Sequence, residues 1–242
     1  MRLSELLFSQ GFGTRRLCAG LVERGLVELA GEVCTDPSTA VDVAAGPLAF
    51  TVQGQPWVYR ERAYLMLHKP AGHECSHRPG AWPSVYTLLP APLRQRPTAG
   101  KLQGVQAVGR LDQDTTGLLL LSDDGAFIHR MNSPRHHVPK VYEVTTRHAL
   151  DERQIARLRA GVVLDDDPKP VAAAAAEALG ERQLRLTLTE GKYHQVKRMV
   201  AAVGNRVEAL HRSRIGGLAL PPDLAPGQWR WLEDAELALL RP

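Results

Sequence analysis

Gly109-Arg110-Leu111-Asp112-Gln113-Asp114-Thr115-Thr116-Gly117 is the stretch from which the fold of this chain is best inferred, and four leucines, residues 118–121, follow it directly. Four consecutive apolar residues, bounded by glycine and by Ser122-Asp123-Asp124-Gly125, predict a strand that is covered on both faces. The polar stretch is then a loop that enters a buried strand. Such a loop is suited to hold a reactive side chain, because its end is anchored in a rigid element.

Asp112 is the residue of this loop best suited to chemistry. Arg110 brings a cation close to it in sequence, and Gly109 and Gly117 permit tight turns on either side. An aspartate in a loop is otherwise more often a turn residue whose carboxylate binds the nearby backbone. Taken by itself, the loop leaves both interpretations open.

Residues 1–45 predict a small module. A short amphipathic helix is expected over residues 4–10 and a second over 14–24, where Thr14 is a suitable cap and Gly25 a stop signal. Alternating residues over 27–33 predict a hairpin.

The rest of the chain predicts one larger domain. Residues 46–62 carry Pro47, Gly54 and Pro56 between polar residues and predict a linker. Strand and helix patterns alternate over 63–242, which predicts a domain that contains both. Within it, residues 78–107 are rich in Pro, Gly and Gln and predict an extended, mobile loop.

Charge and composition narrow the class of partner. The 242 residues include 30 Lys or Arg and 26 Asp or Glu, a net charge of +4, which by itself indicates nucleic acid only weakly. From Lys192 to Arg214, however, six basic residues stand against one acid, Glu208. A solvated helix face is the alternative, but this clustering favours a surface that contacts phosphates.

Several other features argue for a cytoplasmic protein without a metal. The cysteines number three and form no C-x-x-C, as expected in a reducing compartment. The pair His136-His137 is adjacent, so its spacing does not fit a metal site. The N-terminus is polar within five residues and is not a signal peptide, and no apolar run reaches the length of a membrane span.

Four motifs, in order, resemble those of the pseudouridine synthases. They are Lys69-Pro70-x-Gly72, the loop at 109–117, Lys140-x-Tyr142-x-Val144, and the basic segment Glu190-Gly191-Lys192-x-His194-Gln195-Val196-Lys197-Arg198-Met199. The resemblance covers the whole region expected to be catalytic. It implies that family's α+β fold: a mixed, largely antiparallel central sheet with flanking helices and a catalytic cleft.

The N-terminal module resembles the S4 RNA-binding fold, with Thr14-Arg15-Arg16 and residues 21–27 carrying the likeness. Arg15 and Arg16 are expected at the start of the second helix, where backbone amides and the helix dipole also attract phosphate. The module has four Arg against six acids, so we expect its contribution to RNA binding to be local. A helix-hairpin used for packing is the alternative.

The family resemblance implies the reaction. It is an isomerisation of uridine in RNA, in which the N1–C1′ bond breaks and C5 bonds to C1′, and it requires no cofactor. In the family the aspartate is the nucleophile, which implies that role for Asp112. Tyr142 is implied as the base for the C5 proton. Lys197, where relatives more often carry Arg, is implied as the cation beside the nucleophile, with Arg198 as the alternative.

Substrate contacts are implied for further residues. The target base must be flipped out of folded RNA, with Arg110 filling the vacated stack and Leu210 packing on the ring. The remaining residues expected to bind the substrate nucleotide are Arg198, Lys69, His194 and Gln195. Those expected to bind RNA are Arg15, Arg16, Lys192, Arg212 and Arg214.

Within the family, the chain is most similar to the branch that modifies 16S ribosomal RNA of the small subunit. Residues 133–137 and 210–217 favour that branch. A monomer that acts on ribosomal RNA or on an assembling small-subunit particle is therefore expected. An enzyme of large-subunit (23S) RNA and a catalytically silent RNA-binding assembly factor remain as alternatives. The route of attack by Asp112, at C1′, at C6 or through a glycal, stays open.

Overall fold

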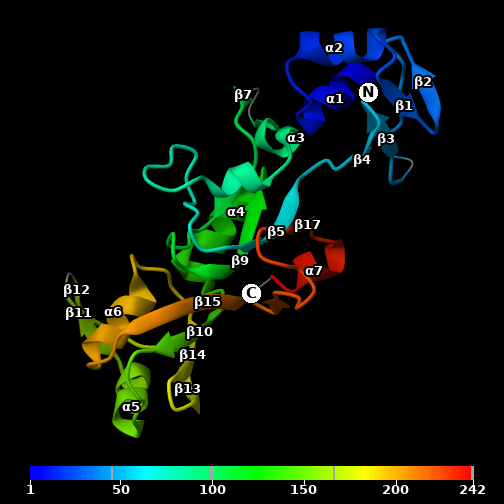
Figure 1. The fold of residues 1–242 in the computed structure, drawn as a ribbon. Coiled ribbons are helices and arrows are strands. Elements are labelled where there is room, and N and C mark those ends of the chain that lie inside the picture. The colour runs from blue at the N-terminus through cyan, green and yellow to red at the C-terminus, as the bar shows by residue number, and fades with distance from the viewer. Residues whose placement is uncertain (45, 99–100, 166, 241–242) are drawn as a thin grey trace. The chain divides into compact units, whose positions relative to one another are not determined.

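The computed structural model describes residues 1–44, 46–98, 101–165 and 167–240 (Figure 1). The chain separates into two compact units. The first contains residues 1–64, 89–106 and 121–124, and the second contains residues 65–88, 107–120 and 125–242.

The first unit begins with two helices and a four-stranded antiparallel sheet. Helix α1 spans Leu3–Gln10 and α2 spans Arg15–Glu23. The strands, in the order β2-β1-β3-β4, are Glu32–Cys34, Val27–Leu29, Ala49–Val52 and Gln55–Val58. Thr14 caps α2 as predicted, because its hydroxyl oxygen accepts the Leu17 N–H at 3.3 Å.

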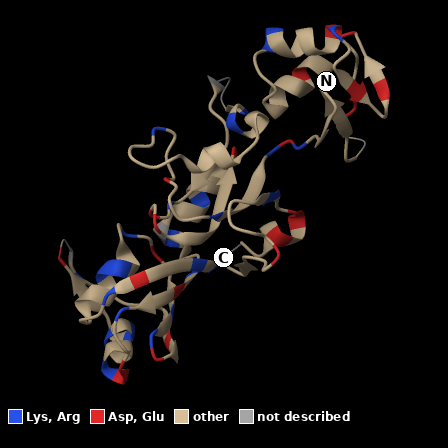
Figure 2. Cartoon of the chain, in the orientation of Figure 1, with Lys and Arg blue, Asp and Glu red and all other residues tan. Residues whose placement is uncertain are grey.

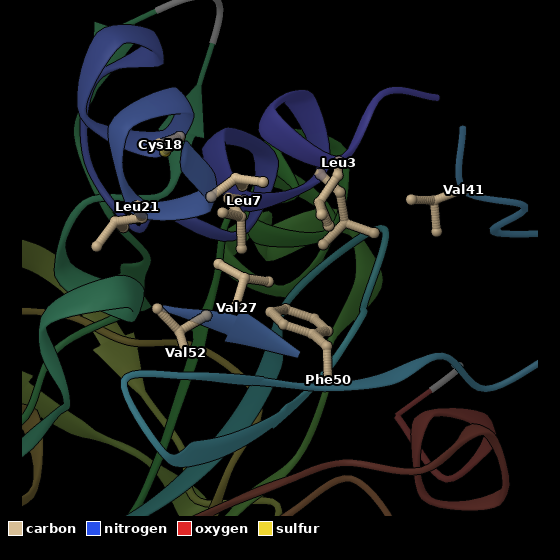
Figure 3. Close-up of a cluster of buried hydrophobic side chains, with 10 residues drawn as sticks. Leu3, Leu7, Cys18, Leu21, Val27, Val41, Phe50 and Val52 are labelled. Carbon is tan, nitrogen blue, oxygen red and sulfur yellow. The ribbon is translucent and has the colours of Figure 1, made fainter. Parts of the chain in front are cut away.

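Apolar side chains from both helices and the sheet form one core in this unit (Figure 3). Each of the buried members is at most 7% exposed. They are Leu3, Leu6, Leu7, Cys18, Leu21, Val22, Val27, Val41, Phe50 and Val52. Burial of this apolar surface is what holds the small module together.

Residues 46–62, expected to be a linker, instead complete this module. Strand β3 pairs with β1 and supplies Phe50 and Val52 to the core. Gln53 and Gly54, with φ of 51° and 74°, form the two-residue turn into β4. Pro56 lies in β4, the last strand of the sheet, where a missing N–H is tolerated. The glycine and proline that suggested a linker are therefore residues of a hairpin.

The expected extended loop over 78–107 contains several short elements. They are a 3₁₀ helix at Val85–Leu88, α3 at Ala91–Arg94, β6 at Pro97–Thr98, β7 at Lys101–Leu102 and β8 at Gln106–Val108. Pro92 lies in the first turn of α3, where proline favours a helix. Gly104, with φ of 72°, lies against the backbone of Arg94, where a Cβ atom would come within 2.4 Å of the Arg94 carbonyl oxygen. The composition that predicted a loop thus also fits a compact turn structure.

Arg96 joins the separate segments of the first unit. It is 1% exposed, and its Nε donates to Asp123 Oδ2 at 2.6 Å. Its Nη1 donates to Gln10 Oε1 at 3.0 Å and its Nη2 to the Arg60 carbonyl at 2.8 Å. Asp123 Oδ1 in turn accepts the Ala63 N–H at 2.8 Å. A buried ion pair with all its described donors satisfied therefore ties α1, the segment after β4 and the end of β9 together.

The second unit is built on a nine-stranded sheet. Its main path runs β13-β14-β10-β15-β9-β5-β17, with β16 beside β15 and β8 beside β9. The strands of the path, in that order, are Ala175–Gly180, Gln183–Leu188, Lys140–Thr146, Val207–Ile215, Thr116–Ser122, Tyr64–Lys69 and Trp229–Trp231, and β16 is Leu218–Ala219. A two-stranded ribbon consists of β11 at Val162–Leu164 and β12 at Asp167–Val171.

Four α-helices belong to the same unit: α4 at Gly125–Asn132, α5 at Glu152–Ala160, α6 at Gln195–Ala202 and α7 at Asp234–Ala238. Strand β9 is buried on both faces, as the four leucines predict. Strands β10 and β14 alternate between buried and more exposed residues. Most described strand pairs are antiparallel, but β15 and β9 run parallel. The predicted α+β class is confirmed.

Candidate active site

A cavity of about 670 Å³ lies in the second unit, beside the loop that enters β9. Its volume is within the range of pockets that hold small molecules, roughly 300–1,000 Å³. Three of the four sequence motifs line it: the loop at 109–115, the motif on β10 and the basic segment at 190–197. Leu210 and Arg212 on β15 complete the wall. Figure 2 shows basic residues on α6, which carries Lys197 and Arg198.

Gly117 sets how closely the loop can approach β15. It has φ of 107°, and a Cβ atom there would lie 2.3 Å from the Arg212 carbonyl oxygen. Glycine is therefore required both for the backbone conformation and for the space. Because β9 and β15 pair at Gly117 and Arg212, this contact brings the loop with Asp112 beside β15.

Lys69 supports the same loop through hydrogen bonds to backbone carbonyls. It is fully buried, and its ammonium donates to the carbonyls of Thr115 at 2.8 Å, Pro70 at 3.0 Å and Gln113 at 3.2 Å. Burial lowers the pKa of Lys69, although the nearby Cys75, Asp114 and Asp112 oppose the shift. It does not line the cavity. The first motif therefore shapes the loop, whereas the sequence analysis expected Lys69 to contact the substrate.

Asp112 lies between two basic side chains. Its Oδ2 is 3.2 Å from Lys197 Nζ, and its Oδ1 is 3.2 Å from His194 Nε2. The Asp112 side chain is 28% exposed. A carboxylate in this position is held by two basic side chains yet can still be reached from the cavity.

Lys197 contacts two carboxylates, those of Asp114 and Asp112. Its Nζ donates to Asp114 Oδ1 at 2.7 Å and Oδ2 at 2.9 Å, closer than to Asp112. Burial is the largest single influence on the pKa of Lys197 and lowers it, but the hydrogen bonds and charges of Asp114 and Asp112 outweigh it, so the pKa is raised. Burial likewise raises the pKa of Asp114, yet the hydrogen bond and charge of Lys197 leave it lowered overall. Lys197 is thus a cation shared by the two acids.

His194 and Gln195 shape the start of α6. His194 precedes the helix with φ of 48°, a left-handed conformation that is uncommon for a residue other than glycine. This conformation accompanies the placement of its ring beside Asp112. The Gln195 side chain accepts the Lys192 N–H at 2.8 Å and donates to Glu190 at 3.2 Å. It therefore stabilises the turn that carries His194.

The other expected substrate contacts are brought to the cavity only in part. Tyr142, Leu210 and Arg110 all line it, and the first two are 9% and 8% exposed. Arg198 is not among the lining residues, and its Nη1 donates to the Tyr193 carbonyl at 3.2 Å. Lys197 is thus placed at Asp112, whereas Arg198 is placed away from the cavity wall.

The residues expected to bind RNA fall into two groups. Lys192 and Arg212 line the cavity, although Arg212 is only 2% exposed. Arg214 is exposed on β15, and Arg15 and Arg16 are exposed in the first turn of α2 in the other unit. Arg15 also lies over the Phe8 ring at 4.3 Å.

Sequence reasoning did not single out several residues of this site, four of which carry polar or aromatic side chains within the motifs. Asp114 binds Lys197, and Lys140, Thr115 and Tyr193 line the cavity. Tyr193 is 74% exposed and stacks on His194, with ring centroids 3.8 Å apart. All four lie inside or beside the motifs quoted above, so their positions in the sequence could have identified them. Their burial and contacts are seen only in the structure.

The arrangement suits nucleophilic attack by a carboxylate on a bound planar ring. Asp112 is the carboxylate that could act in this way, with Lys197 Nζ and His194 Nε2 each 3.2 Å from it, and Tyr142 and Leu210 present an aromatic and an apolar surface. In the part of the chain that is described, no group of three or more His, Cys, Asp or Glu is arranged to hold a metal ion. Within the same residues, no helix has both the length and the apolar character to cross a membrane.

Comparison with known proteins identifies two regions. Residues 63–202 match the model of the RNA pseudouridylate synthase family, and residues 1–45 match that of the S4 domain. The chain is 41% identical to "Ribosomal small subunit pseudouridine synthase A" of Escherichia coli over 98% of its length and 99% of that protein. It is 37% identical to the protein of the same name from Haemophilus influenzae, over 99% of each chain.

A solved structure gives the same result for the fold. A crystal structure described as a pseudouridylate synthase superposes with a TM-score of 0.68 and 34% sequence identity, over 99% of both chains. The fold that the sequence motifs implied is thus confirmed, including the N-terminal S4 domain.

Proposed function

The chain belongs to the RNA pseudouridylate synthase family, and from that premise we propose that it converts a uridine of 16S ribosomal RNA into pseudouridine. Membership makes the protein an RNA pseudouridine synthase. The choice of the small subunit is supported by relatives of that name that match over nearly the whole chain. The observation that carries the proposal is Asp112, a partly exposed carboxylate held 3.2 Å from Lys197 at the cavity.

Asp112 is the nucleophile in this proposal. A carboxylate can attack carbon and later depart, which an isomerisation requires of its catalyst. It attacks as the carboxylate, and Lys197 Nζ, 3.2 Å from its Oδ2, orients it. The loop is supported by Lys69 and packed against β15 at Gly117, so the carboxylate is held in place before the substrate arrives.

Tyr142 is proposed to take the proton from C5 of the uracil, and Leu210 to pack on the ring. Support comes from their position on the cavity wall, largely buried, on the paired strands β10 and β15. Arg110 is exposed in the same loop as Asp112, two residues away. We propose that it fills the place in the RNA stack that the flipped nucleotide leaves.

The S4 domain is proposed to place the RNA. Arg15 and Arg16 occupy the first turn of α2, where exposed side chains and free backbone N–H groups favour phosphate. We propose that the protein acts as a monomer. Because its proposed substrate is ribosomal RNA, we propose that the protein acts in the cytoplasm, where ribosomes are assembled.

The test uses the purified chain and transcripts of 16S and 23S ribosomal RNA labelled with tritium at C5 of uridine. Conversion to pseudouridine releases that tritium, so the wild type should release it from 16S RNA, and mapping then locates the nucleotide. Asp112→Asn keeps the size of the side chain and removes its charge, so it should bind RNA and release no tritium. Release from 23S RNA alone would assign the protein to the large subunit. RNA binding without any release would indicate an assembly factor.

A further inference from the structure

Arg212 is a buried cation that the fold leaves incompletely bonded. It is 2% exposed, and its Nε donates to the Leu118 carbonyl at 2.8 Å. Its Nη2 is buried and has no hydrogen-bond partner in the described part of the chain. Among the same residues, no carboxylate lies within 4.0 Å of its nitrogens. Its side chain lines the cavity that contains Asp112.

The position of Arg212 is unfavourable for stability alone. A guanidinium keeps its proton in proteins, so burial leaves it charged. A buried charge without a counter-ion destabilises the folded state. Lys140, on the neighbouring strand β10, lines the same cavity, and burial followed by the charge of Arg212 lowers the pKa of Lys140. Two basic side chains thus line the same cavity, and the charge of Arg212 acts on Lys140.

Thr115 gives a second, independent indication of a missing partner. Its side chain is 1% exposed, and its Oγ1 is buried without a hydrogen-bond partner among the described residues. It lines the same cavity, just before the pairing of Gly117 with Arg212. Buried polar groups of native proteins are nearly always bonded, so two such atoms in one wall indicate a polar ligand.

We infer that Arg212 binds a carbonyl oxygen of the target uracil and stabilises the negative charge that this ring acquires during the isomerisation. The inference rests on the proposed function and adds a residue that contacts the reacting base. The hydroxyl of Thr115 serves as a second polar contact for the same ring.

The chemistry requires such a cation whichever route Asp112 takes. When the N1–C1′ bond breaks, its electron pair stays with the uracil and spreads from N1 onto the carbonyl oxygens. If Asp112 instead adds to C6, the electrons of the C5–C6 bond move toward the oxygen on C4. In both cases the charge is withdrawn when C5 bonds to C1′. The C5 proton then leaves and N1 takes up a proton, so the product ring is neutral. A donor already placed at the oxygen lowers the energy of the charged state.

Burial distinguishes this role from a contact to the RNA backbone. Phosphates of a folded RNA remain at the protein surface, where exposed cations such as Arg214 and Arg110 can meet them. Arg212 is withdrawn from that surface, whereas a flipped base enters the cavity. Arg212 was expected to bind RNA in general, and its burial makes the contact specific to the base.

The test compares Arg212→Met with the wild type on two RNAs. One carries uridine at the position that the wild type modifies, and the other carries an abasic residue there. Arg212→Met should slow the single-turnover rate on the uridine RNA by ~100-fold or more, the size typical of removing one such donor. It should also bind that RNA more weakly than the wild type does, yet bind the abasic RNA equally well.

Arg214→Met is the matched comparison, because Arg214 is exposed on the same strand. A phosphate contact is indifferent to the base, so this variant should weaken binding to both RNAs by the same factor. Arg212→Lys keeps the charge and should recover part of the rate. Its thermal unfolding and that of Arg212→Met should show a cooperative transition near that of the wild type.

Each remaining outcome contradicts the inference. Equal affinity loss of Arg212→Met on the two RNAs would show a phosphate contact, and a normal rate would show that no charge is stabilised there. Failure of both Arg212 variants to fold would make the residue structural. A wild type that forms no pseudouridine would instead refute the proposed function, and that result is read from the wild-type arm alone.

Discussion

Arg96 and Arg212 are both almost fully buried, at 1% and 2% exposure, yet their surroundings differ in kind. Each nitrogen of Arg96 donates a hydrogen bond, and Asp123 neutralises its charge at 2.6 Å. Arg212 makes one described hydrogen bond, to the Leu118 carbonyl, and its Nη2 has no partner within the described residues. We call the hydrogen-bond network of Arg96 closed, because each of its side-chain nitrogens has a partner. The network of Arg212 is open, because its Nη2 has no partner within the described residues.

The difference separates a residue that holds the fold from one that awaits a ligand. A buried ion pair with every hydrogen bond made offsets much of its desolvation penalty, so it can persist as a structural element. A buried cation without partners is retained despite its cost to stability, which is common at functional sites. The two aspartates agree with this division: Asp123 is 5% exposed, and Asp112 is 28% exposed.

The largest expected effect is the difference in stability between Asp123→Ala, which breaks the network of Arg96, and Arg212→Met. Asp123→Ala leaves Arg96 buried without its counter-ion and should lower the free energy of unfolding of its unit by about 3–5 kcal/mol. Arg212→Met removes a charge that has no partner and should change it by about 1 kcal/mol at most. Chemical denaturation measures both. Adding Arg96→Met to Asp123→Ala should recover most of the loss, and equal losses from Asp123→Ala and Arg212→Met would remove the distinction.

Lys197→Ala tests the charged groups that line the cavity, through their effect on catalysis. Without the shared cation, Asp112 and Asp114 repel each other, so turnover should fall by about 10²–10³-fold, the size typical of losing one electrostatic contact. RNA affinity should change far less, and Lys197→Arg should stay active because it keeps a cation there. Single-turnover rates beside binding isotherms measure this. Normal turnover in Lys197→Ala, with a loss in Arg198→Ala, would give the role to Arg198.

Gln10→Ala should destabilise the closed network by about 1–3 kcal/mol. Its side-chain oxygen accepts from Arg96 Nη1 at 3.0 Å and from the Arg60 N–H at 3.1 Å, and both donors would lose an acceptor. Thermal unfolding checks the loss, with Arg16→Ala, at an exposed position of α2, as the control. An unchanged midpoint would mean that water replaces the amide. For the same reason, deleting residues 1–45 would disrupt this unit and not only remove an RNA contact.

Arg15→Ala with Arg16→Ala is therefore the cleaner test of the S4 domain. Both side chains are exposed, so the fold should be unaffected. Each lost phosphate contact should weaken RNA binding several-fold and reduce the salt slope by about 0.7–0.9. Affinities at several salt concentrations measure this, while turnover at saturating RNA should stay normal. An unchanged affinity and slope would contradict the proposed role of the domain.

The smallest expected effect concerns Asp114 and pH. Its pKa is lowered by Lys197, so its contribution to stability is present above pH 3.8, the unfolded value, and is lost as the pH falls through the folded value. The pKa of Lys197 is raised, so its contribution is present below pH 10.5 and is lost as the pH rises through the folded value. Because the Asp114 side chain is 54% exposed, Asp114→Asn should cost under about 1 kcal/mol at neutral pH. Unfolding midpoints from pH 2 to 6 should converge with the wild type at the acid end, and a constant gap would exclude the ion pair.

Local patterns in the sequence were sufficient to predict much of the fold, and the family resemblance pointed to Asp112 as the candidate nucleophile. Four leucines after a glycine predicted a strand buried on both faces, and Thr14 before Arg15 predicted a helix cap; the structure has both. Such features depend on neighbours a few residues away. The catalytic loop was recognisable for the same reason, because its motif is continuous in sequence.

Local signals failed where one composition fits two structures. Glycine and proline at residues 54 and 56 suit a linker as well as a tight hairpin with an edge strand, and pairing of β3 with the distant β1 decided between them. Lys69 matched its motif, but only the folded chain shows that its ammonium binds backbone carbonyls of the loop.

The sequence alone therefore determined the two kinds of domain, the order of the motifs and Asp112 as the candidate nucleophile. The tertiary structure decided which charged residues are satisfied. Arg96 meets Gln10 across 86 positions, and Arg212 meets Leu118 across 94, so neither contact is encoded locally. Whether a cation stabilises the fold or awaits a substrate depends on its burial and on its hydrogen-bond partners, and both are properties of the folded chain.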